Sequence, residues 1–261
     1  VMGVLNVTPD SFSDGGEFFD TETAVSHALR MAGEGAAFID VGGESTRPGA
    51  APVSAAEELR RVIPVIERLR DATPAVISVD TSKPEVMRAA AAAGAGLIND
   101  VYALRAPGAL EAAISSGCAV CLMHMQGEPR TMQDAPTYRD VVNEVGAFLR
   151  ERTSVCRAAG LPADQILIDP GFGFGKTVEH NLTLLRRLGE LTAEGPPMMV
   201  GLSRKSTVGK LTGRPASERL LGSVVLATIA ALAGARVVRA HDVAATVEAL
   251  KVVAAVRGEP Q

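Results

Sequence analysis

Eight short apolar runs, each ending on a polar or charged side chain, are spread along the whole chain, and most of them are separated by segments with helical periodicity. Strands that alternate with helices form a parallel sheet. If eight such strands close into a barrel, all their carboxyl ends meet at one rim. The runs end at Asn6, Asp40, Asp80, Asn99-Asp100, His124, Asp169, Ser203-Arg204-Lys205 and Arg239-Ala240-His241.

The sequence therefore predicts a (β/α)8 TIM barrel made by a single domain, residues 1–261. Barrels of about 250 residues commonly form one domain. An open, doubly wound sheet is the alternative, but no dinucleotide-binding glycine fingerprint follows the first run, where the chain continues Asn6-Val7-Thr8-Pro9. Because the chain starts at Val1 without an initiator methionine, we expect N-terminal residues of the full protein to be missing.

Composition argues against several classes of function. The net charge of −4 gives no general attraction to nucleic acid or anionic membranes, and 3% aromatic residues provide few stacking platforms for bases. No apolar stretch approaches the ~20 residues of a membrane span. Three cysteines are too few for a disulfide framework, and Cys118 and Cys121 fall inside a strand-like run, where we interpret them as small buried residues. The expected compartment is the reducing cytoplasm.

The strand ends carry two chemically complementary sets of side chains. The first set is cationic or amide: Asn6, Lys205, Arg239 and His241. Arg239 and His241 are two positions apart in an extended segment and so project the same way, which predicts a bound anion at the barrel mouth. Asn6 could ligate a divalent cation there. The alternative is a structural ion pair between Arg239 and an acid elsewhere.

The second set is acidic or amide, and consists of Asp80, Asn99 and Asp169. Carboxylates accept paired N–H groups from an amidine-like edge, so this set could read a 2-amino-4-oxopyrimidine ring. The alternative is that such residues cap helices. We prefer the capping interpretation for Ser82 and Asp242, but not for Asp169, because a proline follows it.

Residues 169–177 are rich in glycine but do not match a Walker phosphate loop, because Pro170 stands where the first glycine is required. The glycines allow the backbone to pass close to a flat ligand. Phe172 or Phe174 could cover such a ring, although either could equally belong to the core. His124, a single histidine at a strand end, is more typical of a structural residue.

Taken together, these motifs resemble the dihydropteroate synthase family of folate biosynthesis, and the resemblance extends over essentially the whole chain. The segments that carry it are residues 3–16 (GVLNVTPDSFSDGG), 40–49 (DVGGESTRPG), 78–82 (SVDTS), 98–100 (IND), 123–126 (MHMQ), 169–176 (DPGFGFGK), 201–206 (GLSRKS) and 239–243 (RAHDV).

The resemblance implies a transferase that condenses (7,8-dihydropterin-6-yl)methyl diphosphate with 4-aminobenzoate, giving 7,8-dihydropteroate and diphosphate. It also implies a Mg²⁺ cofactor, a homodimer, and sulfonamides that compete as mimics of 4-aminobenzoate. The long loops 8–16 and 42–52 would close over both substrates. Similar barrels include pterin-dependent methyltransferases, and a non-catalytic pterin-binding paralogue is a further alternative. Neither alternative accounts for Arg239, His241 and the intact loop motifs.

Matching positions assign a role to each candidate residue. By the resemblance, the pterin would be held by Asp80, Asn99, Asp169 and Lys205, the diphosphate by Thr46, Arg239 and His241, and Mg²⁺ by Asn6. The aminobenzoate pocket would contain Thr46, Arg47, Pro48, Phe174 and Ser203. Catalysis would depend on Asp80, Asp169, Lys205, Arg239 and His241. Ala240, in the same substrate-binding segment, replaces an often larger apolar residue and is expected to point away from its two neighbours.

Overall fold

The computed structural model describes residues 1–8, 17–45, 51–128, 131–193 and 195–258, and it confirms the (β/α)8 barrel. Each predicted apolar run forms a strand, because a strand covered by helices outside and by side chains inside is buried on both faces. The strands are β1 (Met2–Asn6), β2 (Phe38–Gly42), β3 (Val76–Asp80), β4 (Leu97–Asp100), β5 (Ala119–Met123), β6 (Ile166–Asp169), β7 (Met199–Gly201) and β8 (Val237–Ala240).

The strands pair in the order β6-β5-β4-β3-β2-β1-β8-β7, and every pair is parallel. β1 pairs with both β2 and β8, so the two ends of the chain meet in the sheet. β6 and β7 come together through a parallel bridge between Ile168 and Met198. This bridge closes the sheet, and a closed sheet places all eight carboxyl ends on one rim.

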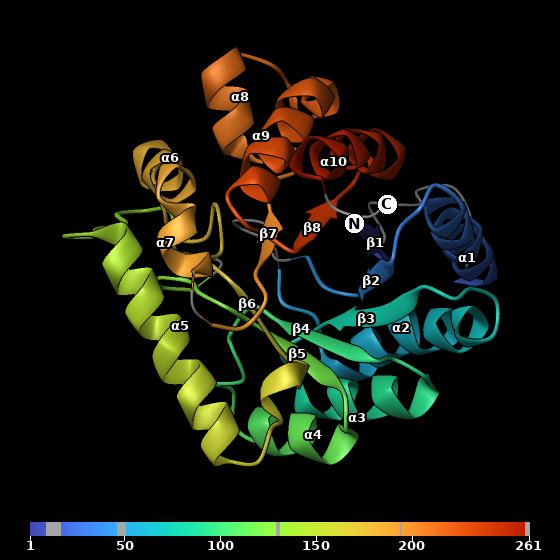
Figure 1. Ribbon diagram of the computed structural model, residues 1–261. Coiled ribbons are helices and arrows are strands. Elements are labelled where there is room, and N and C mark those ends of the chain that lie inside the picture. The colour runs from blue at the N-terminus through green and yellow to red at the C-terminus, as the bar shows by residue number, and fades with distance from the viewer. Residues whose placement is uncertain (9–16, 46–50, 129–130, 194, 259–261) are drawn as a thin grey trace.

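The helices surround the strands on the outside of the barrel (Figure 1). None of those in the described ranges is long and apolar enough to cross a membrane. They are α1 (Glu17–Gly33), α2 (Ala55–Arg70), α3 (Pro84–Ala93), α4 (Ala109–Ser116), α5 (Val141–Ala158), α6 (Val178–Arg186), α7 (Leu188–Thr192), α8 (Ser206–Thr212), α9 (Leu220–Leu232) and α10 (Val243–Arg257), with 3-10 turns η2 (Ala163–Gln165) and η3 (Ala216–Glu218).

Two residues that we interpreted as helix caps have other partners. The N-cap position of α3 is Lys83, not Ser82, and the Ser82 hydroxyl donates to the Asp100 carboxylate instead. Asp242 does stand at the N-cap position of α10, but its carboxylate accepts from Arg204 at 3.0 and 2.5 Å rather than from the helix. In both cases the partner is a charged side chain from another part of the chain, Asp100 for Ser82 and Arg204 for Asp242.

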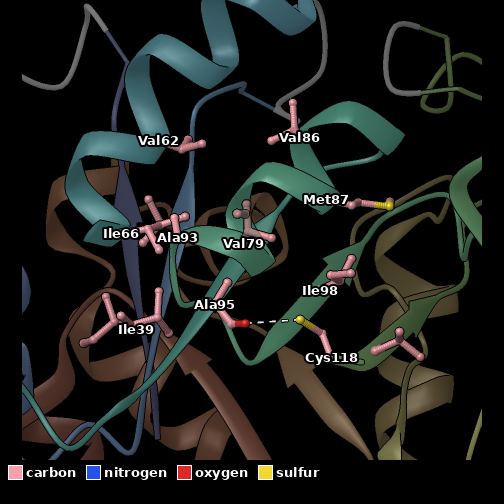
Figure 2. Close-up of a cluster of buried hydrophobic side chains, with 14 of the residues drawn as sticks. Ile39, Val62, Ile66, Val79, Val86, Met87, Ala93, Ala95, Ile98 and Cys118 are labelled. Atoms are coloured by element: carbon pink, nitrogen blue, oxygen red, sulfur yellow. Dashed lines mark hydrogen bonds between the residues drawn. The ribbon is translucent and has the colours of Figure 1, made fainter. Parts of the chain in front are cut away.

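The largest core lies between the strands and the outer helices. In Figure 2, Ile39, Val79 and Ile98 from three neighbouring strands pack with side chains of α2 and α3. Full burial of one such side chain contributes about 1.5–3 kcal/mol. Cys118 belongs to this cluster and lies 3.1 Å from the Ala95 carbonyl oxygen. All three cysteines are free and buried, which confirms the interpretation of the C-x-x-C pair.

The barrel interior consists of an apolar floor with polar side chains above it. The floor contains Met2, Leu97, Cys121, Met199 and Val237, with Phe38 and Leu167 packed against it. Every second residue of a strand faces the same side, and alternate strands of a barrel contribute to the same layer. On each even-numbered strand, the residue two positions after the floor residue is polar and lies on the rim side of the floor. These residues are Asp40 on β2, Asn99 on β4, Asp169 on β6 and Arg239 on β8.

Candidate active site

Arg239 lies between two buried carboxylates from different strands. Its Nε donates to Asp40 Oδ2 at 2.6 Å, and its Nη2 donates to Asp80 Oδ2 at 2.9 Å. Arg239 therefore does form a structural ion pair, which the sequence analysis gave as the alternative to binding an anion. The two roles are compatible, because a guanidinium carries five N–H donors and these contacts use two of them. The predicted acidic and cationic sets therefore meet in one cluster.

Asn99 belongs to the same cluster through Asp40. Its Nδ2 donates to Asp40 Oδ2 at 3.0 Å, while the Ser78 hydroxyl donates to Asp40 Oδ1 at 2.6 Å. The side chain of Asp40 is fully buried, and those of Asn99 and Ser78 are also buried. The sequence marked Asp40 only as the end of a run and gave it no role. The feature of the sequence that could have identified Asp40 is a single carboxylate inside an otherwise apolar strand.

Asp169 and Lys205 approach the cluster from β6 and from the segment after β7. Asp169 Oδ1 accepts from the Gly171 backbone N–H at 2.7 Å. The Lys205 ammonium donates to the Phe172 carbonyl and lies 4.3 Å from the centre of the Phe174 ring. Phe172 itself is buried in the core, so of the two phenylalanines only Phe174 is available to a ligand.

Burial acts against the charged forms of the ionisable groups in this site. Desolvation raises the pKa of Asp169 and raises that of Asp80 to about 7, while it lowers the pKa of Lys205 to about 8. Burial also acts to lower the pKa of Arg239, but Asp40 and Asp80 outweigh it and raise that pKa. Such opposed shifts in a poorly solvated site are typical of functional centres.

The glycine-rich loop after β6 is fixed by a buried lysine that the sequence reading missed. Lys176 Nζ lies 3.0 Å from the carbonyl oxygens of Gly171 and Phe174, and 2.9 Å from Nδ1 of His124. Desolvation lowers the pKa of Lys176 to about 7, and desolvation together with the Lys176 charge lowers that of His124 to about 3. His124 is buried and contacts Phe148, in agreement with a structural role.

His241 is paired with Ser203, one of the predicted pocket residues. The Ser203 hydroxyl oxygen lies 3.0 Å from His241 Nδ1 and accepts the His241 backbone N–H at 3.1 Å. No serine had an identifiable basic partner in the sequence, because residues 38 positions apart meet only when β7 and β8 lie side by side. Ala240, between Arg239 and His241, is buried and pairs in register with Gly3.

Asn6 ends β1 next to the acidic cluster. A side-chain carbon added at Gly42 would lie 3.8 Å from Asp80 Oδ2 and 3.9 Å from Asn6 Oδ1, so these two oxygens flank the same point of β2. Amide and carboxylate oxygens suit Mg²⁺, which usually takes only one or two protein ligands and keeps water and phosphate oxygens as the others. Among the described residues no group of three or more His, Cys, Asp or Glu could hold a metal.

Three predicted pocket residues, Thr46, Arg47 and Pro48, lie outside the described residues, as does most of loop 8–16. The remaining candidates are placed at the rim side of the barrel or on the loops that follow the strands. Arg239 is in direct contact with Asp80, 159 positions away in the sequence, and with Asp40, 199 positions away. This convergence of distant strand ends is what the barrel prediction required.

Comparison with known proteins agrees with this geometry. Residues 2–241 match the family model described as pterin binding enzyme. The chain is 56% identical over 255 residues to dihydropteroate synthase of Escherichia coli strain K12, covering 98% of this chain and 90% of that protein.

Solved structures give the same result. A dihydropteroate synthase from Yersinia pestis in a sulfonamide drug complex superimposes with a TM-score of 0.94 at 52% identity, covering 98% of this chain and 94% of that one. The Xanthomonas albilineans enzyme in complex with 7,8-dihydropteroate gives 0.90 at 53% identity, covering 99% and 94%. The chain therefore belongs to the dihydropteroate synthase family of pterin-binding enzymes.

Proposed function

We propose that this chain condenses (7,8-dihydropterin-6-yl)methyl diphosphate with 4-aminobenzoate, giving 7,8-dihydropteroate and diphosphate. The observation that carries the proposal is the single cluster in which Asp80 and Asn99, suited to a pterin ring, meet Arg239, suited to a diphosphate. End-to-end similarity to dihydropteroate synthases supports the same reaction.

The pterin site is built from acceptors. Asp80 and Asp169 are carboxylates in a buried environment, and the amidine-like edge of a pterin offers paired N–H donors. Lys205 supplies a cation beside Asp169, and Phe174 places an aromatic face next to that cation. We assign the aminobenzoate to the Phe174 side, near Ser203, where sulfonamides would compete with it.

The reaction breaks the bond between the pterin methylene carbon and a diphosphate oxygen, and forms a bond from that carbon to the amine nitrogen. The electron pair of the broken bond leaves with diphosphate, and the nitrogen loses one proton to solvent. Arg239 and His241 would stabilise the charge that grows on the departing diphosphate. An arylamine is already unprotonated at neutral pH, so the chemistry requires no strong base.

We also propose a Mg²⁺ ion held by Asn6. The Asn6 amide oxygen and the Asp80 carboxylate oxygen flank the same position of β2, and such oxygen donors fit the preference of Mg²⁺. When bound, the ion would neutralise charge on the diphosphate, as metal ions do at phosphoryl oxygens. Asn6 ends β1, which pairs with β8, the strand that carries Arg239, so Asn6 and Arg239 come from neighbouring strands.

Purified protein tests this function directly. With both substrates and Mg²⁺ we expect release of diphosphate and formation of 7,8-dihydropteroate, with loss of turnover in EDTA and recovery on adding Mg²⁺. A methyltransferase would release no diphosphate under these conditions. A non-catalytic paralogue would bind pterin in a calorimetric titration but turn nothing over. Either result from a folded sample would overturn the proposal.

We further propose that two copies of the chain associate through α9 and α10. Twelve large apolar side chains are exposed among the described residues, and eight of them lie on α8, α9 and α10. On α9 the exposed residues Leu221, Val225, Ile229 and Leu232 recur at helical spacing and form one stripe. A stripe that meets its own copy across a twofold axis is buried on both sides at once.

We also propose that the protein works in the reducing cytoplasm, which its three free cysteines fit.

A further inference from the structure

We propose that Asp40 is a positioning residue, which sets the orientation of both Asn99 and Arg239 toward the pterin diphosphate. This inference rests on the proposed function. Asp40 lies on β2 and its side chain is fully buried, whereas the Arg239 side chain that it holds is 22% exposed. It cannot contact a substrate at the rim, so it acts through the residues that it holds.

Three donors from three other strands converge on this carboxylate. The Ser78 hydroxyl from β3 occupies Oδ1 at 2.6 Å, and Oδ2 accepts from Asn99 Nδ2 at 3.0 Å and from Arg239 Nε at 2.6 Å. A carboxylate has about four acceptor positions, so these three contacts saturate most of its capacity. Moving any one of the partners would break a buried, charge-assisted hydrogen bond.

The contact with Asn99 determines which end of the amide faces the ligand. A carboxylate beside a guanidinium is an acceptor only, so Asn99 must turn its NH₂ group toward Asp40. Its Oδ1 then points away from Asp40 and presents an acceptor. The acceptor complements a ring N–H rather than a ring nitrogen lone pair, so Asp40 decides what Asn99 can recognise.

The contact with Arg239 fixes one part of the guanidinium and leaves other N–H groups for a ligand. Asp40 binds Nε, and Asp80 binds Nη2 at 2.9 Å, which fixes the plane of the group at two points. These two contacts use two of the five N–H groups, so three N–H donors of the guanidinium are not engaged by Asp40 and Asp80. A guanidinium held in this way meets an anion without first losing the conformational freedom of its long side chain.

The substitution Asp40→Asn tests this role, because it keeps the shape but removes the charge and lets the Asn99 amide reverse. We expect kcat/KM for the pterin diphosphate to fall about 10- to 100-fold, the effect of small misplacements in an active site. The KM for 4-aminobenzoate should stay within about 3-fold, since neither Asn99 nor Arg239 is assigned to that substrate. Calorimetry should show weaker binding of both the diphosphate-free pterin alcohol and inorganic diphosphate.

Matched variants separate positioning from general damage. Thr246→Val removes a buried hydrogen bond on α10, from the Thr246 hydroxyl to the Asp242 carbonyl, and should leave the ratio of the two KM values unchanged. Ser78→Ala, which keeps the Asp40 charge, should give a smaller loss of the same pterin-specific kind if Asp40→Asn does not fold.

Equal losses for both substrates, or no loss in either Asp40→Asn or Ser78→Ala, would overturn the role of Asp40. Failure of the proposed function is distinguishable, because the unsubstituted protein would then release no diphosphate.

Discussion

At the residue scale, several ionisable side chains are buried in pairs, and burial disfavours their charged forms. Lys176 and His124 are the clearest case, with Lys176 Nζ 2.9 Å from His124 Nδ1 and both side chains nearly inaccessible to solvent. Burial and, after it, the charge of Lys176 lower the pKa of His124, so the ring is neutral at neutral pH and its Nδ1 can accept from Lys176. The pair therefore makes the stability of the protein depend on pH.

Stability should fall on acidification because His124 gains a proton only when the protein unfolds. Its pKa is about 3 in the folded protein and near 6.5 in the unfolded chain, so the unfolded state binds more protons between these values. The stabilisation is complete above about pH 6.5 and is lost progressively toward pH 3, by up to about 1.4 kcal/mol per pH unit.

Urea unfolding at several pH values checks this expectation in His124→Asn, whose amide oxygen can accept from Lys176 in place of Nδ1. Between pH 7 and 5, where most carboxylates stay ionised, the free energy of unfolding should fall less steeply in the variant than in the parent. Parallel curves for the two proteins would show that His124 does not carry the acid sensitivity.

At the scale of elements, the loop between β6 and α6 passes close to the His124 backbone, and a glycine makes this close approach possible. Gly171 has a φ of +66°, and its N–H reaches the Asp169 carboxylate. A side-chain carbon added there would lie 1.9 Å from the His124 carbonyl oxygen. The loop can carry Asp169 and the Phe172 carbonyl to Lys205 only because this position has no side chain.

Gly171→Ala should therefore be far more costly than Gly117→Ala at the end of α4. Gly117 has nearly the same φ, +70°, but a carbon added there meets nothing within 4 Å. Both variants incur about 1–2 kcal/mol for a left-handed alanine, and only Gly171→Ala adds about 1–3 kcal/mol for overpacking. Urea titrations measure both values. Equal losses would mean that the loop moves freely away from His124.

At the scale of the whole molecule, the apolar surface is concentrated on one side of the barrel. α8, α9 and α10 lie together at the top of Figure 1, and they carry exposed residues such as Leu221 at 73% and Val256 at 77%. Contiguous exposed apolar surface of this kind marks an interaction site. The side of the barrel formed by α2, α3 and α4 exposes only Ile114 among the large apolar residues of these helices.

Val225→Arg should convert the proposed dimer to a monomer, because it places a charge in the middle of the α9 stripe. Light scattering after size exclusion should give about twice 27.1 kDa for the parent and 27.1 kDa for the variant. Val155→Arg on α5, at a similarly exposed valine away from the stripe, should remain dimeric. A parent that elutes as a monomer, or a Val225→Arg variant that stays dimeric, would contradict this interface.

Much of the architecture was predictable because its signals are local. Each apolar run of four to seven residues became a strand, and each helical pattern became a covering helix. The rim residues followed directly, since the carboxyl ends of parallel strands share one side. The capping interpretations of Ser82 and Asp242 were less successful, because the choice of partner depends on charges from other elements.

By itself, the sequence determined the closed barrel, the set of polar residues at its mouth and the family, because strand length, periodicity and motif are properties of neighbouring residues. Only the tertiary structure decided the pairings: Asp40 with Asn99 and Arg239, Ser203 with His241, and Lys176 with His124. These pairings depend on the register and closure of the strands. Register and closure arise from contacts between segments up to 199 positions apart, so the sequence around each residue does not contain them.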